Sequence, residues 1–260
     1  GNGSTTGPEI NLGWEPQWVM IKNTESAESW AIYDSMRGIN SGGNDLGLYA
    51  DGNYSEYSAN IIDLTSTGFK LVSSAGDVNE SNKNFIYVCI RRPDGYVGKP
   101  PELGTDVFAM DTGNGSTTVP AFDSGFPVDF GLSRKYASAN HWRAGARLMA
   151  PNYVNADNGD AEEYQYVGDA FKHWDSNTGY LAHSSGDYDS DYQAWMWKRH
   201  AGFDVVTYTG VNPSSDAQSV PHGLGKVPEM MWIKRRSGNN LGNWNVYHKG
   251  LNGGTNPEQY

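Results

Sequence analysis

Short apolar runs recur along the N-terminal part of the chain, and each is bounded by residues that favour turns. The runs are rich in β-branched and aromatic side chains and are flanked by Gly, Asn, Asp and Ser, as is typical of short strands joined by tight turns. No long stretch repeats its apolar residues with the period of an α-helix. The pattern therefore predicts an all-β fold with little helix, as β-sandwiches of jelly-roll or lectin-like type. The predicted strands are Trp18–Lys22, Trp30–Tyr33, Gly47–Tyr49, Asn60–Leu64, Gly68–Val72 and Phe85–Ile90.

An internal repeat organises this pattern. The hexapeptide Gly1–Thr6 recurs letter for letter as Gly113–Thr118. An ungapped register that also matches aromatic positions indicates duplication of a structural unit. Matching positions in this register are Pro8 and Pro120, Gly13 and Gly125, Trp14 and Phe126, Trp18 and Phe130, Lys22 and Arg134, and Trp30 and Trp142.

A third copy of the unit begins near Tyr208. Its Trp232–Lys234 aligns with Met20–Lys22, and its Trp244–Tyr247 aligns with Trp30–Tyr33. We therefore predict tandem β-sandwich modules, and we expect either further sequence after the third copy or its completion by another element. The modules are predicted as residues 1–104, residues 105–205 with an aromatic and acidic insert at 152–191, and an incomplete third module at 206–260.

Charge and composition narrow the classes of partner. The chain has 19 Lys and Arg against 30 Asp and Glu, a net charge of −11, and nucleic-acid binding needs a basic footprint that is missing here. No apolar run exceeds Phe85–Ile90, which is too short for a membrane span, so we expect no membrane insertion. The single cysteine, Cys89, excludes an intrachain disulfide and a cysteine metal cage. We expect Cys89 to be a buried small hydrophobe.

The insert of the middle copy carries the first candidate binding site. Its aromatic residues alternate with Asp, Asn, Glu and His. Sugars are held in concave sites by aromatic stacking together with a few placed polar groups. The alternative is that these aromatics fill the core of their own module or a subunit interface. The candidate glycan contacts are Trp174, Tyr164, Tyr166, Tyr180 and His173.

The same insert carries a candidate calcium site. Asp187, Asp189 and Asp191 occupy alternate positions, so on an extended loop their carboxylates would point to one side and offer hard oxygen ligands. The sixth-position glycine and the distal glutamate of a calcium loop are missing. The alternative is an ordinary solvated acidic loop. No other cofactor is predicted.

Catalytic patterns are missing from the sequence. It has no Gly-Xaa-Ser-Xaa-Gly and no His-Glu-Xaa-Xaa-His motif, and we expect His222 and His248 to have structural roles at turns. Glu162 and Glu163 could pair with the aspartates of the insert for glycoside cleavage, but the separation of two carboxylates decides that mechanism and the sequence does not supply it. We expect the protein not to be an enzyme.

Two of the copies resemble a known family. Gly13–Lys22 in the first copy, and Val220–Gly225 and Asn243–Leu251 in the third, are similar to a module repeated in fibre and adhesin proteins of tailed bacteriophages, many of them marine. The middle copy matches that pattern only loosely. The resemblance implies a concanavalin-like or jelly-roll sandwich with a structural and adhesive role, and it carries no catalytic residues.

From this resemblance we expect a virion structural protein of a tailed phage, a tail or side fibre whose tandem modules attach to the host surface. The expected location is the virion surface. The expected partners are a host cell-surface glycan or envelope receptor, other virion proteins, and further copies of the chain, with a trimer favoured. The alternatives are a carbohydrate-binding lectin-like module, a head-surface decoration protein and a secreted bacterial adhesin.

Overall fold

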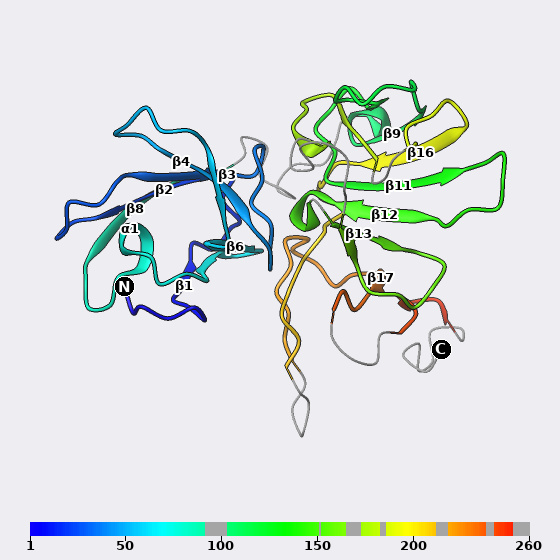
Figure 1. The fold of residues 1–260 in the computed structure, drawn as a ribbon. Coiled ribbons are helices and arrows are strands. Elements are labelled where there is room, and N and C mark those ends of the chain that lie inside the picture. Colours follow the sequence, from blue (N-terminus) through cyan, green and yellow to red (C-terminus); the bar gives the residue numbers. More distant parts are fainter. Residues whose placement is uncertain are drawn as a thin grey trace.

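The computed structural model describes residues 1–91, 103–150, 152–164, 173–182, 186–211, 218–237 and 242–251. These residues form antiparallel sheets, and the only α-helix among them is the four-residue α1 (Gly76–Asn79). Two β bodies lie side by side, one formed by the blue and cyan part of the chain and one by the green and yellow part (Figure 1). The predicted all-β sandwich fold is confirmed.

The first body pairs a five-stranded sheet with a three-stranded one. The strand orders are β5-β4-β3-β2-β8 and β1-β7-β6. Side chains alternate along β2 between half-buried and buried, the period expected of a strand with one face on a core. All six predicted strands form. The strands are β1 (Glu9–Asn11), β2 (Trp18–Asn23), β3 (Ala31–Asp34), β4 (Asp45–Tyr49), β5 (Tyr57–Ala59), β6 (Ile62–Thr65), β7 (Gly68–Leu71) and β8 (Phe85–Ile90).

The second body has a six-stranded sheet in the order β14-β13-β12-β11-β16-β9 and a two-stranded sheet of β10 and β15. Its core contains Phe122, Trp174, Tyr180 and Met196, all at most 2% exposed. The short 3-10 helix η1 (Gly104–Asp106) precedes the sheet, and η2 (Arg147–Met149) follows β12. The strands are β9 (Phe108–Thr112), β10 (Phe122–Asp123), β11 (Phe130–Lys135), β12 (Arg143–Ala146), β13 (Asn152–Asn155), β14 (Glu163–Tyr164), β15 (Gly179–Tyr180) and β16 (Tyr192–Trp197).

The sequence repeat carries over into the backbone. Strands β2 and β11 begin at the matched positions Trp18 and Phe130, and β3 and β12 hold the same place in their sheets. Gly13 and Gly125 adopt nearly the same positive φ, 76° and 75°, a conformation that glycine adopts at little cost. The two bodies are therefore variants of one unit, and β9 pairs at the edge of the second sheet in a place that no strand among the described residues takes in the first.

The repeated hexapeptide packs its first glycine tightly against the body. A Cβ on Gly113 would lie 2.1 Å from the carbonyl oxygen of Tyr188, and a Cβ on Gly1 would lie 2.2 Å from that of Glu80. Real Cβ atoms do not approach backbone oxygen this closely, so only glycine fits at both positions without moving the chain. This close approach explains why the hexapeptide begins with glycine in both copies.

We expect Gly113→Ala to destabilise the second body. The added methyl group would push the hexapeptide away from the turn at Tyr188, and overpacking of this kind costs about 1–3 kcal/mol. Urea unfolding followed by tryptophan fluorescence measures the change. Gly210→Ala is the matched control because no atom lies within 4 Å of its Cβ position. Equal midpoints for the two variants would contradict the packing argument.

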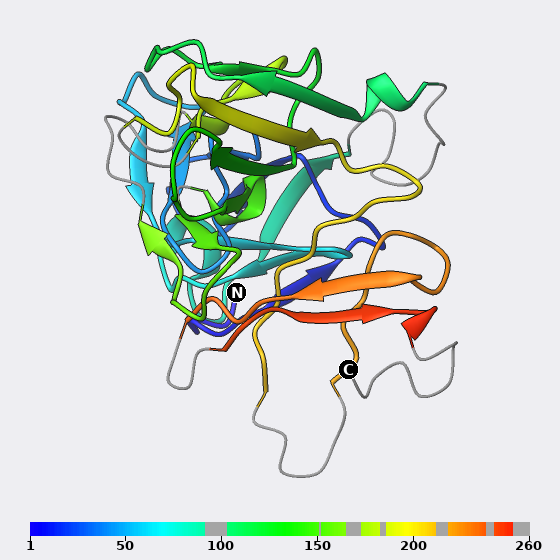
Figure 2. The same ribbon diagram turned by 90° about the vertical axis from the view of Figure 1, so that its right-hand side faces the viewer.

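The third part of the chain is a hairpin of β17 (Met230–Ile233) and β18 (Asn245–His248). The hairpin lies below the six-stranded sheet in the view of Figure 1, and Figure 2 shows its two strands in orange and red. Its strands correspond by the repeat to β2 and β3. Two cations tie it to the second body: Lys234 Nζ donates to the carbonyl of Asn158 at 2.9 Å, and Arg236 Nε lies 2.7 Å from a Glu162 carboxylate oxygen.

The first two bodies are joined by buried charges. Arg199 reaches from the second body to Glu15 in the first and donates to both carboxylate oxygens, at 2.6 and 3.0 Å. Asp129 lies on the other side of this guanidinium and also accepts the Arg199 backbone N–H at 2.8 Å, and all three residues are at most 4% exposed. Leu148 from the second body belongs to the core of the first. The junction is therefore a packed interface.

Candidate functional site

The structure places the candidate glycan contacts of the insert in the core. Trp174 and Tyr180 are 2% and 0% exposed, and their ring centroids lie 4.9 Å apart. His173 is 3% exposed. The backbone of Tyr164 belongs to β14, and Tyr166 lies outside the described residues. Because they are buried, Trp174, Tyr180 and His173 are inaccessible to a ligand in this fold. Trp174 and Tyr180 fill the core of their own module, which is the alternative that the sequence left open.

The three aspartates of the candidate calcium site do not converge. Arg143 Nε lies 3.4 Å from Asp187, and Lys135 Nζ lies 2.9 Å from Asp191. The segment forms a turn rather than an extended loop, and Asp189 is exposed. Within the part of the chain that the structure describes, no group of three or more His, Cys, Asp or Glu side chains is placed to hold a metal ion. Two of the three carboxylates serve ion pairs instead.

The remaining candidate residues have local roles. His222 Nδ1 accepts the backbone N–H of Leu224, and His248 Nδ1 accepts that of Gly250, at 3.2 and 3.1 Å. The predicted turn roles of these histidines are confirmed. Cys89 packs against the first core but is only half-buried, so the predicted full burial is wrong; the partial burial raises the pKa of its thiol to about 11. Because only the thiolate is reactive, this cysteine is inert near neutral pH.

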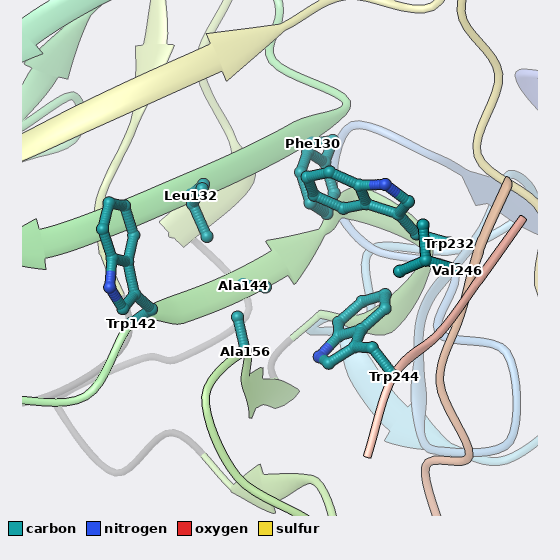
Figure 3. Close-up of a pocket in the computed structure, with 8 residues that line it drawn as sticks. All are labelled: Phe130, Leu132, Trp142, Ala144, Ala156, Trp232, Trp244 and Val246. Carbon is teal, nitrogen blue, oxygen red and sulfur yellow. The ribbon is translucent and has the colours of Figure 1, made fainter. Parts of the chain in front are cut away.

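A pocket lies between the six-stranded sheet and the hairpin. Its volume is about 320 Å³. Figure 3 shows Trp142 on one side of the space and Trp244 and Trp232 on the other. The remaining lining residues are Phe130, Leu132, Ala144, Ala156 and Val246. The pocket thus combines three tryptophans and one phenylalanine with four aliphatic side chains, and it has no charged group.

Strand alternation explains how these residues meet. Phe130, Leu132 and Ala144 lie on the face of β11 and β12 that points away from the core, and β17 and β18 supply Trp232 and Val246. Trp142 and Trp244 occupy the same position in their respective copies of the repeat. One wall of the pocket is therefore the outer face of one module, and the other wall is the corresponding strand pair of the next.

The aromatic surface continues beyond the pocket. The ring centroid of Trp195 lies 5.3 Å from that of Trp142, and the Arg134 guanidinium lies 5.2 Å from the centroid of Trp142. Within the pocket, Trp244 Nε1 is buried and has no hydrogen-bond partner among the described residues. The arrangement is suited to stacking and apolar burial, and the buried Trp244 Nε1 is not accessible to a ligand. No lining residue can act as a general acid, base or nucleophile.

The pocket was not predicted from the sequence, although the sequence contains one feature that points to it. The match of Trp30, Trp142 and Trp244 across three copies was visible. A residue shared by all copies suggests core packing, whereas Trp142 lies on the outer face of its sheet. The docking of the hairpin on that face depends on contacts such as Lys234 with Asn158, which are 76 residues apart.

The described residues contain no helix with the length and apolar character needed to cross a membrane. A comparison with curated proteins and with solved structures finds no match to either. One family model matches residues 1–92 and 112–258, and its second segment begins one residue before the second copy of the repeated hexapeptide. The chain therefore belongs to the family described as a domain of unknown function, DUF7483.

Proposed function

We propose that the chain is a structural segment of a tail or side fibre on the virion surface of a tailed phage, where its tandem β-modules serve host attachment. The resemblance of the first and third copies to phage fibre and adhesin modules suggests this role. The observation that carries it is the packed junction, in which buried Arg199 and Glu15 join consecutive modules. Modules joined in this way extend a rod without a free hinge.

The proposed attachment surface is the tryptophan pocket together with its rim. Trp142, Trp195 and Arg134 offer an aromatic platform with one cation. Aromatic rings bind the apolar face of a sugar ring, and a neighbouring polar group gives direction to the contact. A host cell-surface glycan is therefore the proposed ligand class at this site.

Immunogold electron microscopy with an antibody against residues 1–260 tests the proposed place in the particle. We expect gold label along the fibres of phage particles that encode this sequence. Label confined to the head would replace the fibre proposal with a head decoration protein. Unlabelled particles together with labelled bacterial cells would replace it with a bacterial adhesin.

We expect Trp142→Ala to abolish glycan or host-cell binding by the purified chain. The substitution removes one wall of the pocket and the ring beside Arg134. Glycan arrays and binding of labelled protein to bacterial cells are the measurements. Trp30→Ala is the matched control because Trp30 holds the same repeat position in the first module, outside the pocket. Equal binding by both variants would contradict the proposed attachment surface while leaving the structural role in place.

A further inference from the structure

The tryptophan pocket lies between corresponding positions of two copies of the repeat. The side chains from the second body and those from the hairpin face each other across it (Figure 3). Three positions of the repeat line both walls, and the corresponding pairs are Leu132 and Trp232, Trp142 and Trp244, and Ala144 and Val246. Each copy therefore presents the same outward-facing positions to the other, so these positions can form both sides of one contact.

The first module carries the same positions on its own sheet. Trp30 and Trp142 form the same hydrogen bonds in their modules, since each donates its backbone N–H to an aspartate and accepts the N–H of an alanine. These bonds fix the correspondence of Ala50 with Ala156. The first-module counterparts of the five second-body residues that line the pocket are Trp18, Met20, Trp30, Ile32 and Ala50. All five are apolar, so the first module has a face of the type that forms the pocket.

This outer face of the first module is apolar across three strands. Met20 on β2 pairs with Ile32 on β3 and with Val88 on β8, so the three side chains lie on one face of the sheet. On β8, Ile86, Val88 and Ile90 are 52%, 49% and 53% exposed. A contiguous apolar patch on a protein surface marks an interaction site.

A lysine at the rim of the pocket also has its counterpart in the first module. Lys234 of the hairpin donates from Nζ to the carbonyl of Asn158 in the second body, at 2.9 Å. Lys22 holds the position of Lys234, and Gly52 holds that of Asn158. Lys22 Nζ donates to two carbonyls of its own loop, and an ammonium group has three donors. The first module therefore carries both members of this polar contact, with one donor left to reach a second copy.

We propose that the outer face of the first module, centred on Trp18, Met20, Ile32 and Val88, binds the same face of a second copy of the chain about a two-fold axis. A second copy is the occupant because the chain already forms this contact once, between corresponding positions of its second and third copies. The hairpin is not the occupant, since its outward-facing positions already line the pocket. A face that binds its own kind makes an isologous interface, which closes at two chains. The proposal does not depend on the function proposed above.

Sedimentation velocity over a range of concentrations tests the interface. We expect a monomer–dimer equilibrium for the parent chain and monomer alone for Met20→Lys, because the lysine would bury its charge in an apolar contact. Met110→Lys is the matched control that keeps the dimer, since Met110 is 61% exposed on a strand of the second body. Val88→Lys repeats the test at a second point of the face, and circular dichroism checks that the variants are folded. A monomeric parent chain, a trimer, or a dimer that persists in both Met20→Lys and Val88→Lys would overturn the proposal.

A pull-down between purified copies tests the two-fold symmetry. We expect affinity-tagged parent chain and tagged Met110→Lys to capture untagged parent chain. We expect tagged Met20→Lys to capture none, because an isologous contact needs the same face intact in both copies. In a head-to-tail contact, tagged Met20→Lys would still offer its other surface to the intact face of the parent chain. Equal capture by tagged Met20→Lys and by the tagged parent chain would therefore overturn the two-fold interface.

Discussion

Glu15→Ala is expected to destabilise the folded chain by about 3–5 kcal/mol, because it leaves a buried arginine without its main partner. Arg199 donates two hydrogen bonds to Glu15, and both side chains are almost fully buried at the junction of the first two bodies. Asp129 lies 3.8 Å from Arg199 but also 3.7 Å from Arg147. One carboxylate would then face two buried guanidinium groups. Urea unfolding of the whole chain measures the loss.

Two further variants separate charge burial from the loss of a contact. Glu25→Ala removes the same type of side chain from an exposed pair with Lys83, and such pairs contribute less than about 1 kcal/mol. The double variant Glu15→Leu with Arg199→Leu removes both charges, so we expect it to recover part of the stability that Glu15→Ala loses. A single variant at position 15 that unfolds at the same urea concentration as the parent would show that the junction is not held by this pair.

Local pattern was sufficient to predict the strands of the first body. Val19 and Ile21 point into the core while Trp18 and Met20 do not, and an alternation of this kind is legible in the sequence because it depends on neighbouring residues only. Strand β9 escaped the sequence reasoning. Its Phe108–Thr112 mixes apolar and polar residues, and its identity depends on pairing with β16, which lies far along the chain.

The site could be predicted less well than the strands, for a physical reason. Trp174 and Tyr180 lie among polar residues in the sequence, as surface aromatics do, yet the sandwich closes over them. Glu15 and Arg199 meet across 184 residues, and neither carries a local signal of burial. Whether a side chain is buried depends on how the sheets stack. The sequence pattern gives information on that stacking only where the repeat allows two copies to be compared.

The repeat also explains why the tryptophan pocket exists. The outer face of β11 and β12 carries Phe130 and Leu132, and the corresponding face of the first sheet carries Trp18 and Met20. An outer face this apolar is suited to packing against a neighbouring module. In the second body the hairpin supplies that neighbour through Trp232 and Trp244, with the pocket left between them. The proposed ligand site and the module contact are thus two parts of one surface.

Buried Asp45 gives the second large prediction, a fall in stability with rising pH. Its carboxylate is 0% exposed and accepts the backbone N–H groups of Asn40, Ile61 and Ile62, at 2.8–2.9 Å. Burial outweighs these hydrogen bonds and raises the pKa of Asp45 from 3.8 to about 7. The folded state therefore holds this proton more tightly than the unfolded chain does. A shift of this size corresponds to a stability change on the order of 4 kcal/mol.

The sign follows from which state binds the proton. Below about pH 4 both states are protonated at this group, and its contribution to stability is fully present. Between pH 4 and about pH 7 the unfolded chain ionises first, so the free energy of unfolding falls, and it levels off above the folded pKa. We expect Asp45→Asn to flatten this fall. We also expect it to lower stability, because the NH₂ group of the introduced amide is a donor and would face backbone N–H groups that need an acceptor. Urea unfolding at intervals from pH 4 to pH 8 measures both effects.

Asp51→Asn is the control because this exposed carboxyl has the opposite shift. The backbone N–H of Trp30 lowers the pKa of Asp51, so its contribution to stability is lost as pH falls through the acid range and is constant above it. The two aspartates therefore act in separate pH windows and with opposite signs. The free energy of unfolding of Asp45→Asn could instead fall between pH 4 and pH 7 as steeply as that of the parent. The titrating group would then be another residue. Asp45 would be ionised in the folded state, because its three N–H donors would outweigh the effect of burial.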